Sequence, residues 1–240
     1  MELPQTGMLE LVSTHEIQIF NPLMNKKKRY MTVRLKEILD SVYADSWSSA
    51  DYSDISFRAL DGYEAIGSLT MLLEDGAFLA YEDLDREQGW EPIGHKQADP
   101  GPFFLVWNKK HQTTANAYPW PWQITEINLL RFEDQYPAVM PRGANPGSPA
   151  RLGFQIFRDR CLRCHAMNRQ GGKIGPDLNA PQSIVAYRSE QMIKSYIRQA
   201  SQFRYTQMPD HPDLSDPDLD NLYRYFQYQD QHRMQPDDPR

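Results

Sequence analysis

The sequence is poor in cysteine, has no long apolar run and carries no excess of positive charge. Two cysteines in 240 residues cannot build a disulfide-rich scaffold. No stretch approaches the ~18 consecutive apolar residues that a membrane-spanning helix needs, so no membrane span is predicted. The formal net charge of −6 argues against a nucleic-acid partner. One short basic run, residues 26–29, stands out, and we predict a solvated turn there.

What the chain does contain is enough apolar surface for a packed interior. Hydrophobic residues make up 40% of the sequence and aromatic residues 12%. This composition excludes a wholly disordered chain. At ~100–200 residues per domain, a chain of this length predicts one or two domains.

Both cysteines lie in one pentapeptide, C-L-R-C-H, which runs from Cys161 through Cys164 to His165. This is the attachment pattern of c-type haem. Two thiols add to the two vinyl groups of one porphyrin, and the adjacent histidine is held under the ring as an iron ligand. A zinc site would need two or three further ligands. A thioredoxin-like motif would follow a strand, whereas residues 151–160 have a helical pattern. A chance match to the pattern or a simple disulfide is the remaining alternative.

The residues around the pentapeptide predict helices separated by loops. Apolar residues recur at helical spacing over 151–160, over 189–200 with Met192 on the buried stripe, and after a capping box that opens at Ser215. Between the first two helices, residues 171–178 form a glycine-rich loop. The Pro176 carbonyl in this loop can accept the proton on the non-ligating nitrogen of His165, which would fix the orientation of the imidazole.

With these pieces in order, residues 148–230 resemble a class I monohaem cytochrome c. The matching pieces are Gly153 and Phe157, the pentapeptide, Gly175-Pro176-Asp177-Leu178, Met208-Pro209, and Leu222 with Tyr225. The resemblance implies an all-α domain with one covalent haem c on Cys161 and Cys164, ligated by His165. In that family the methionine of the Met-Pro pair is the sixth iron ligand, which here is Met208.

Three other residues compete for the sixth position. Met167 is two residues past His165 and cannot reach the opposite face of the haem. Met192 fits the buried stripe of its helix, where methionine usually fills the core. His211 is the serious rival, although a lone loop histidine is more often solvated. The methionine–proline pair favours Met208, and His/Met ligation raises the reduction potential, which suits an electron acceptor.

A stretch rich in proline and glycine, residues 137–149, predicts a domain boundary. Charge divides there too. Residues 1–147 carry 13 Lys/Arg against 21 Asp/Glu, or −8, and residues 148–240 carry 13 against 11, or +2, which together return −6. We predict an N-terminal domain over 1–140, a linker over 141–148, a cytochrome c domain over 149–232 and a tail over 233–240.

The N-terminal domain reads as α+β and mostly β. Alternating or compact apolar runs predict strands at 16–20, 54–60, 77–81, 103–107 and 123–127, and helical spacing predicts a helix over 33–42. The tryptophans Trp107, Trp120 and Trp122 lie close to Tyr118 in sequence and are expected in the core. The scattered His15, His95 and His111 are expected to be surface or hydrogen-bonded side chains rather than metal ligands.

In the order of its elements, this domain is similar to the molybdopterin-binding domain of the sulfite-oxidase family. The similarity rests on Val33-x-Leu35-Lys36-x-Ile38-Leu39, Phe57-x-x-x-Asp61-Gly62-Tyr63, Phe78-Leu79-Ala80-Tyr81, Gly101-Pro102-Phe103-Phe104-Leu105-Val106 and Trp122-Gln123-Ile124-x-x-Ile127. In that family a cysteine thiolate binds molybdenum. This domain has no cysteine, so the similarity implies the fold, and we expect no molybdenum centre and no molybdopterin.

Three functions fit these observations. The first is a c-type cytochrome that passes single electrons to and from redox partner proteins, with the N-terminal domain in partner docking. The second is an oxidoreductase whose N-terminal domain binds a small substrate or cofactor, and the third is a redox sensor. The first function needs only residues that the sequence contains. Haem attachment predicts a periplasmic protein, and because residues 1–10 lack a basic and apolar leader pattern, we expect the mature form.

Overall fold

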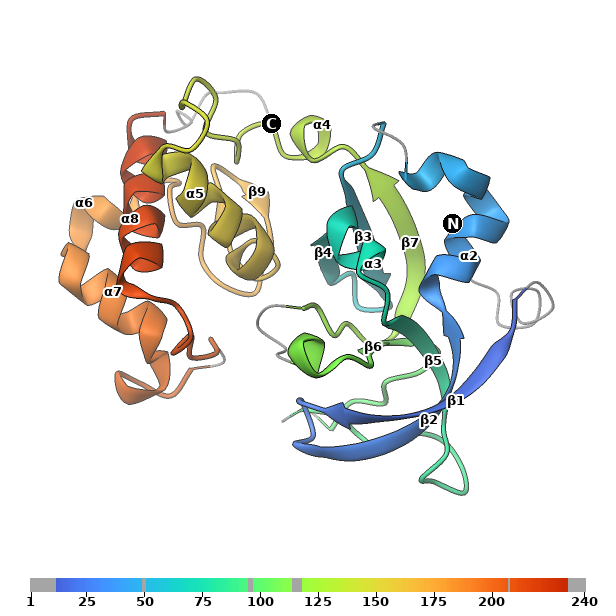
Figure 1. The fold of residues 1–240 in the computed structure, drawn as a ribbon. Helices are drawn as coiled ribbons and strands as arrows, with labels where there is room; N and C mark the ends of the chain where they lie inside the picture. The colour runs from blue at the N-terminus through green and yellow to red at the C-terminus, as the bar shows by residue number, and fades with distance from the viewer. Residues whose placement is uncertain (1–11, 49–50, 95–96, 114–117, 207, 233–240) are drawn as a thin grey trace. The chain divides into compact units, whose positions relative to one another are not determined.

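The computed structural model describes residues 12–48, 51–94, 97–113, 118–206 and 208–232. The chain divides into two compact units, Met1–Phe132 and Glu133–Arg240 (Figure 1). This division lies before the predicted linker. The predicted limits of the N-terminal domain (1–140), the linker (141–148) and the cytochrome c domain (149–232) stay predictions. The predicted tail, 233–240, lies outside the described residues. Each unit is described by itself.

The N-terminal unit is mostly β-sheet, as its apolar alternation predicts. One antiparallel sheet has the order β1-β2-β5-β6, and a second has the order β4-β3-β7. The strands are β1 (Thr14–Asn21), β2 (Lys26–Arg34), β3 (Asp54–Ala59), β4 (Glu64–Ser68), β5 (Ala77–Asp83), β6 (Phe104–Trp107) and β7 (Ile124–Leu130). The helices are α2 (Leu35–Tyr43) and α3 (Leu69–Leu73), with 3₁₀ turns at Ala44–Ser48 and Lys110–Thr113. The five predicted strands and the predicted helix are confirmed.

One continuous core fills the N-terminal unit. The interior residues of β3, β5 and β6 join the inner face of α2. Trp107 is fully buried, and its indole N–H donates to the Pro119 carbonyl at 2.7 Å. Trp120 is buried against Phe104, and the half-buried Trp122 packs on the same cluster. The aromatic residues therefore form core packing, which was their expected role.

The prediction for residues 26–29 was wrong. These residues begin β2, which pairs with β1 from Lys26 to Val33. Period-two alternation turns Lys28 inward together with Tyr30. Lys28 is only 1% exposed. The strand was not predicted because one of its inward positions holds a charged residue, Lys28. The expected pattern of alternating apolar and polar residues is therefore absent here.

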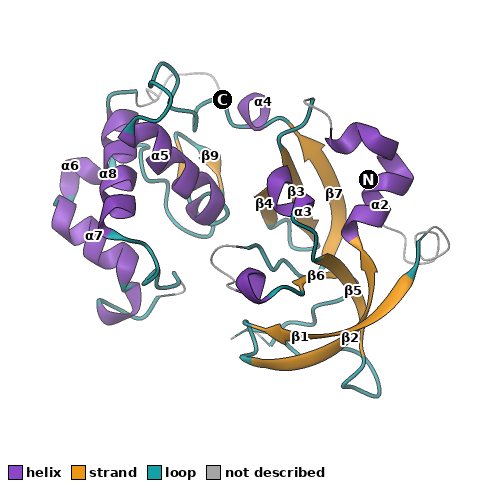
Figure 2. Cartoon of the chain, in the orientation of Figure 1, coloured by secondary structure: helices purple, strands orange, loops and turns teal. Residues whose placement is uncertain are grey.

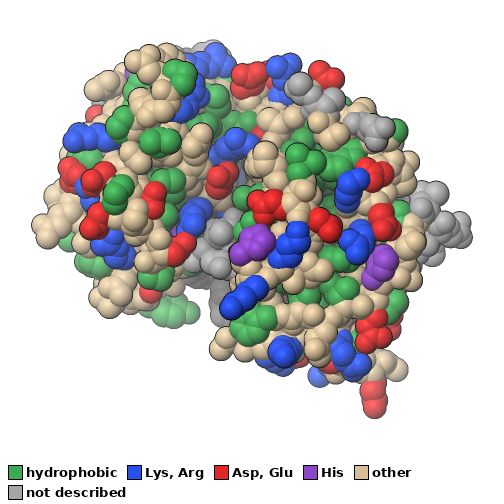
Figure 3. All heavy atoms as spheres, in the orientation of Figure 1, with side chains coloured by type: hydrophobic (Ala, Val, Ile, Leu, Met, Phe, Trp, Pro, Cys, Tyr) green, Lys and Arg blue, Asp and Glu red, His purple; other side chains and the backbone are tan. Residues whose placement is uncertain are grey.

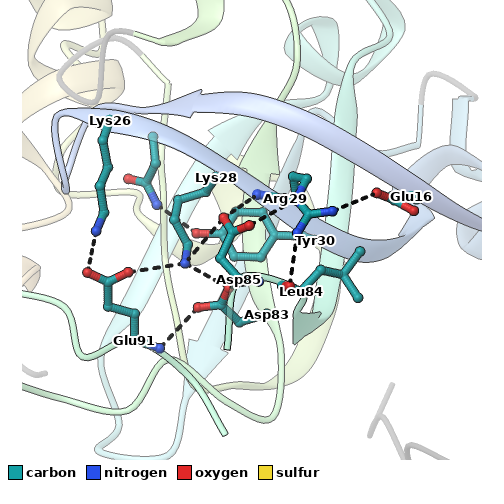
Figure 4. Close-up of polar contacts among 10 residues, drawn as sticks. Glu16, Lys26, Lys28, Arg29, Tyr30, Asp83, Leu84, Asp85 and Glu91 are labelled. Atoms are coloured by element: carbon teal, nitrogen blue, oxygen red, sulfur yellow. Dashed lines mark hydrogen bonds and ion pairs between the residues drawn. The ribbon is translucent and has the colours of Figure 1, made fainter. Parts of the chain in front are cut away.

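Lys28 stays charged because carboxylates surround it (Figure 4). Its ammonium lies 2.7 Å from Asp83 and 3.1 Å from Glu91. Burial alone would lower the pKa of Lys28, but the hydrogen bonds with Asp83 and Glu91 raise it above its usual value. Asp83 also accepts the backbone N–H groups of Asp85 and Glu91, both at 3.1 Å. The cluster therefore ties β2 to β5 and to the loop that follows β5.

The C-terminal unit is built from short helices around one long one, which Figure 2 shows in purple. Its helices are α5 (Pro149–Ile156), α6 (Ile184–Tyr187), α7 (Glu190–Arg198) and α8 (Asp216–Asp230). Further elements are the π-helical turn η3 (Phe157–Cys161), the 3₁₀ turn Ala200–Gln202, and the two-residue strands β8 (Ala166–Met167) and β9 (Gln170–Gly171). The helix α4 (Phe132–Gln135) lies at the division of the two units.

The helix α8 begins as its sequence predicts. The Ser215 hydroxyl accepts the N–H of Asp218, and the Asp218 carboxylate accepts the N–H of Ser215 at 3.0 Å. This capping box satisfies two backbone N–H groups that the first turn leaves without an acceptor. The acidic residues of this turn also lie at the positive end of the helix dipole. The capping-box prediction is confirmed.

Close packing of α5 on α8 organises the C-terminal core. A side chain at Gly153 would overlap the backbone carbonyl of Asn221, so only glycine permits this approach. Phe157 packs its ring 5.4 Å from the ring of Tyr225 and 6.2 Å from that of Phe226. The predicted stripe on α7 was wrong in part, because Met192 is 43% exposed while Ile193 is buried.

The surface of the chain carries both signs of charge. On the face drawn in Figure 3, Lys and Arg side chains alternate with Asp and Glu side chains rather than gathering into a patch of one sign. Within the ranges that the structure describes, no helix has the length and apolar character needed to cross a membrane.

Candidate functional site

The first cysteine of the pentapeptide closes a π-helical turn. The helix α5 passes into η3, and the N–H of Leu162 donates to the Phe157 carbonyl at 2.9 Å, five residues back. The N–H of His165 then donates to the Cys161 carbonyl at 2.8 Å. Single π turns occur often at functional sites. This turn presents both thiols and the imidazole from one rigid helix end.

The glycine-rich loop folds against the pentapeptide. The N–H of Gly172 donates to the Leu162 carbonyl, and that of Gly175 donates to the Cys164 carbonyl, both at 2.8 Å. A Cβ added at Gly175 would lie 2.5 Å from Cε1 of His165. Because such a contact is impossible for real atoms, glycine is required where the loop passes the imidazole. The loop positions the carbonyl that follows.

His165 has one nitrogen committed and one available. Its Nδ1 lies 2.9 Å from the Pro176 carbonyl, so a proton on Nδ1 is held there and Nε2 is free of it. Burial lowers the pKa of His165, although the bond to Pro176 opposes the shift. The ring is therefore neutral at neutral pH, which is the form that ligates a metal. The hydrogen bond that sequence predicts is present, and its role toward an iron stays a prediction.

The donor set fits covalent haem c. Cys161 and Cys164 are both free thiols in the structure, not a disulfide. Burial raises the pKa of Cys161 to about 12 and that of Cys164 above its usual value. A zinc site would need two or three further ligands, and in the part of the chain that the structure describes no three His, Cys, Asp or Glu side chains gather as a metal site.

This geometry agrees with a family comparison. Residues 150–230 match the cytochrome c family model. The C-terminal unit therefore carries a cytochrome c domain, which indicates a haem protein that transfers electrons and implies covalent haem c. The match covers 81 of the 240 residues, all within one unit. A search of curated proteins found none that matches the chain.

Met208 lies in the loop of the cytochrome c domain between Gln202 and α8. Its side chain is half-buried, and its backbone N–H donates to the Thr206 hydroxyl at 3.1 Å. The rival Met167 is fully buried in β8, directly after the pentapeptide. The rival Met192 is exposed on α7. Neither the burial of Met167 nor the exposure of Met192 favours these residues over Met208 as the sixth ligand.

His211 differs from its expected solvated state. It is only 4% exposed, and its backbone N–H lies 3.2 Å from the carbonyls of Ile197 and Arg198. Its Nδ1 has no hydrogen-bond partner among the described residues. Burial, reinforced by the charge of Arg160, lowers the pKa of His211 to about 4. The loop after Met208 thus turns inward and buries a neutral imidazole.

This burial predicts an acid-sensitive cytochrome c domain. The folded pKa of His211, about 4, lies below the ~6.5 of an unfolded chain. Its stabilising contribution is therefore complete above pH 6.5 and is lost as the pH falls towards 4. Between pH 6.5 and 4 the wild type should lose up to about 3 kcal/mol of its free energy of unfolding through His211, at 1.36 kcal/mol per pKa unit. We expect the His211→Phe variant not to show this loss. Guanidinium unfolding followed by haem absorbance between pH 7 and 4 measures it.

The exposed His232 provides the control for this experiment. Because it lies in the same domain at the surface, His232→Gln should keep the wild-type slope of stability against pH. A His211→Phe variant that keeps the wild-type slope as well would contradict the assignment of this acid loss to His211.

The two described histidines of the N-terminal unit each lie near a different carboxylate. His15 packs its ring edge against Phe78, with Nε2 3.7 Å from Glu37. The exposed His111 lies 3.2 Å from Glu74. His95 lies outside the described residues. In the described ranges no three His, Cys, Asp or Glu side chains gather as a metal site.

The sequence analysis includes Asp177 only as part of the matching loop and does not predict the hydrogen bonds of its side chain. Its carboxylate accepts three backbone N–H groups, from Arg169 at 2.6 Å, Asn179 at 2.8 Å and Ala180 at 2.9 Å. These bonds hold the carbonyl of the preceding residue, Pro176, in place. An aspartate that follows Gly-Pro and precedes Asn by two residues is the available signal, because Asp binds backbone N–H groups two residues ahead.

Proposed function

We propose that this protein is a c-type cytochrome that transfers single electrons through one covalently bound haem c with His165 and Met208 as axial ligands. The observation that carries the proposal is the arrangement of the pentapeptide, in which two free thiols precede an imidazole whose Nδ1 is hydrogen-bonded to the Pro176 carbonyl. A bound haem c would supply an iron that alternates between the ferrous and ferric states.

The residues of the chain have separate parts in this function. Cys161 and Cys164 attach the group through thioethers, and His165 offers Nε2 to the iron. Pro176 keeps the imidazole in one orientation and, by drawing on its N–H, makes the ring a stronger donor. Met208 offers a thioether sulfur, which favours the ferrous state and so raises the reduction potential. If His165 and Met208 both hold the iron, the bound group would serve electron transfer rather than ligand chemistry.

Location and docking are parts of the same proposal. Covalent attachment of c-type haem in bacteria takes place outside the cytoplasmic membrane, which supports a periplasmic protein with redox partner proteins. Residues 1–147 have a net charge of −8. We assign the N-terminal unit, with its sulfite-oxidase-like order of elements, to partner docking, where acidic charge steers a basic partner. Its lack of cysteine supports a domain without molybdenum.

Replacing Met208 with alanine tests the axial ligand and the function together. We expect Met208→Ala to lower the midpoint potential by a substantial part of the roughly 0.8 V range that axial ligands span. The variant should also bind carbon monoxide in the ferrous state, because the sixth position opens. Redox titration and carbon monoxide difference spectra measure these effects, and the wild-type ferric protein should show the weak near-infrared thioether–iron band.

The exposed methionine of α7 gives a matched control. Met192→Ala should leave the potential and the spectra unchanged. A Met208→Ala protein with the wild-type spectrum would rule out Met208, and a wild-type spectrum without the thioether–iron band would point to His211. A wild-type protein that carries no covalent haem would overturn the proposed function itself.

A further inference from the structure

We propose that a buried amide network of Asn168, Asn179 and Gln229 is the positioning device for the His165–Pro176 hydrogen bond. The same network makes the segment 136–142 an anchor of the cytochrome c domain. The inference rests on the proposed function, and it concerns residues that neither attach nor ligate the haem.

The three amides form a directed chain of hydrogen bonds. Asn179 Nδ2 donates to Asn168 Oδ1 at 2.7 Å and to the Gln229 carbonyl at 2.6 Å. Asn168 Nδ2 donates to Gln229 Oε1 at 2.8 Å and to the Ala138 carbonyl at 2.9 Å. Gln229 Nε2 donates to the Val139 carbonyl at 2.8 Å. All three side chains are almost fully buried. Because buried amides without partners are costly, each bond depends on the others.

The network joins four separate segments of the C-terminal unit. Asn168 lies three residues after His165, and Asn179 lies three residues after Pro176. Gln229 comes from the last turn of α8, and the segment 136–142 comes from ahead of α5. The two ends of the loop that carries the imidazole and its acceptor are therefore held by the same three side chains.

Backbone geometry supports this assignment. Asn168 has φ of 53° in the two-residue turn between β8 and β9, a conformation in which asparagine is favoured. The turn aims its side chain into the network. Nearby, the N–H of Leu178 donates to the Ala166 carbonyl at 2.9 Å, so the loop is closed where the amides meet. A loosened network would let the Pro176 carbonyl move away from His165.

The segment 136–142 is held to the domain by the aromatic side of α8 as well. The Tyr225 hydroxyl donates to the Val139 carbonyl at 2.8 Å, and the Tyr228 hydroxyl donates to the Arg142 carbonyl. Val139 is itself fully buried. A segment that composition alone marks as a boundary thus supplies the carbonyls on which the network ends.

The test replaces Gln229 with methionine, which keeps its length and removes its amide. A weaker His165–Pro176 bond makes the imidazole a poorer donor and destabilises the ferric state. We therefore expect Gln229→Met to raise the midpoint potential of the full-length protein. We also expect the Leu178 amide to exchange about tenfold faster relative to the Leu222 amide of α8, the factor for one lost buried hydrogen bond.

Two controls separate positioning from general destabilisation. Gln227→Met makes the same change two residues away on α8, outside the network, and should alter neither readout. Leu219→Ala removes a buried side chain of α8 and should lower the unfolding midpoint while the potential and the exchange ratio stay the same. If Gln229→Met does not fold, Asn179→Ala, which removes fewer bonds, is expected to shift both readouts in the same direction.

The outcomes distinguish the two proposals. A potential that stays unchanged or falls, or an exchange ratio equal to that of Leu219→Ala, would overturn the positioning role. Covalent haem missing from the wild type would overturn the proposed function, and the exchange ratio would still report whether the network holds the loop.

Discussion

A variant with both Cys161→Ala and Cys164→Ala will retain no haem on the denatured polypeptide. These are the only cysteines in the chain, so no other thiol can form a replacement thioether. The wild type should retain one haem per chain after denaturation, measured by haem staining of a denaturing gel and by the pyridine haemochrome spectrum. Each single variant keeps one thiol and should retain less haem than the wild type.

The consequence should be confined to the cytochrome c domain. All five tryptophans lie before residue 133, so tryptophan fluorescence follows the unfolding of the N-terminal unit. Its unfolding midpoint should be the same in the double variant and in the wild type. Arg163→Ala, inside the same pentapeptide, should keep covalent haem. Haem that resists denaturation in the double variant would disprove attachment at these thiols.

Lys28→Met should cost the N-terminal unit about 3–5 kcal/mol, the loss expected when one partner of a buried ion pair is removed. The change leaves the Asp83 carboxylate, which is 2% exposed, without its cation at 2.7 Å. A domain of this size is stable by only about 5–15 kcal/mol, so the loss is a large fraction of the total. Guanidinium unfolding followed by tryptophan fluorescence measures it.

The neighbouring lysine of β2 makes a close control for this measurement. Lys27 is exposed on the opposite face of the strand, and Lys27→Met should change stability by less than about 0.5 kcal/mol. Adding Asp83→Asn to Lys28→Met should recover part of the loss, because the uncompensated charge is removed. Equal stabilities of the Lys27→Met and Lys28→Met proteins would show that the cluster contributes nothing net.

The spacing of residues along the chain correctly predicted those features that depend only on neighbouring residues. The helix over residues 33–42, the capping box at Ser215 and the strand at 54–60 all depend on neighbours within a few positions, and each is present in the structure. The pentapeptide belongs to the same class, since its chemistry is complete within five residues. The acceptor for His165 was predictable because the loop that supplies it carries a glycine–proline signal.

Partners distant in sequence explain the failures. Lys28 is buried because Asp83 and Glu91, more than 50 residues away, neutralise it, and no local pattern contains that pairing. His211 is buried because its loop packs on the end of α7. Both residues look solvated to any method that reads polarity along the chain.

By itself, the sequence predicted a haem-attachment site, and it was enough to indicate a cytochrome c domain and a second, mostly β unit without cysteine. Only the tertiary structure decided that Lys28 and His211 are buried, and that carbonyls of segment 136–142 accept hydrogen bonds from Asn168 and from α8. The physical reason is that covalent attachment needs only adjacent side chains, whereas the burial of charge and amide groups depends on partners that folding brings together.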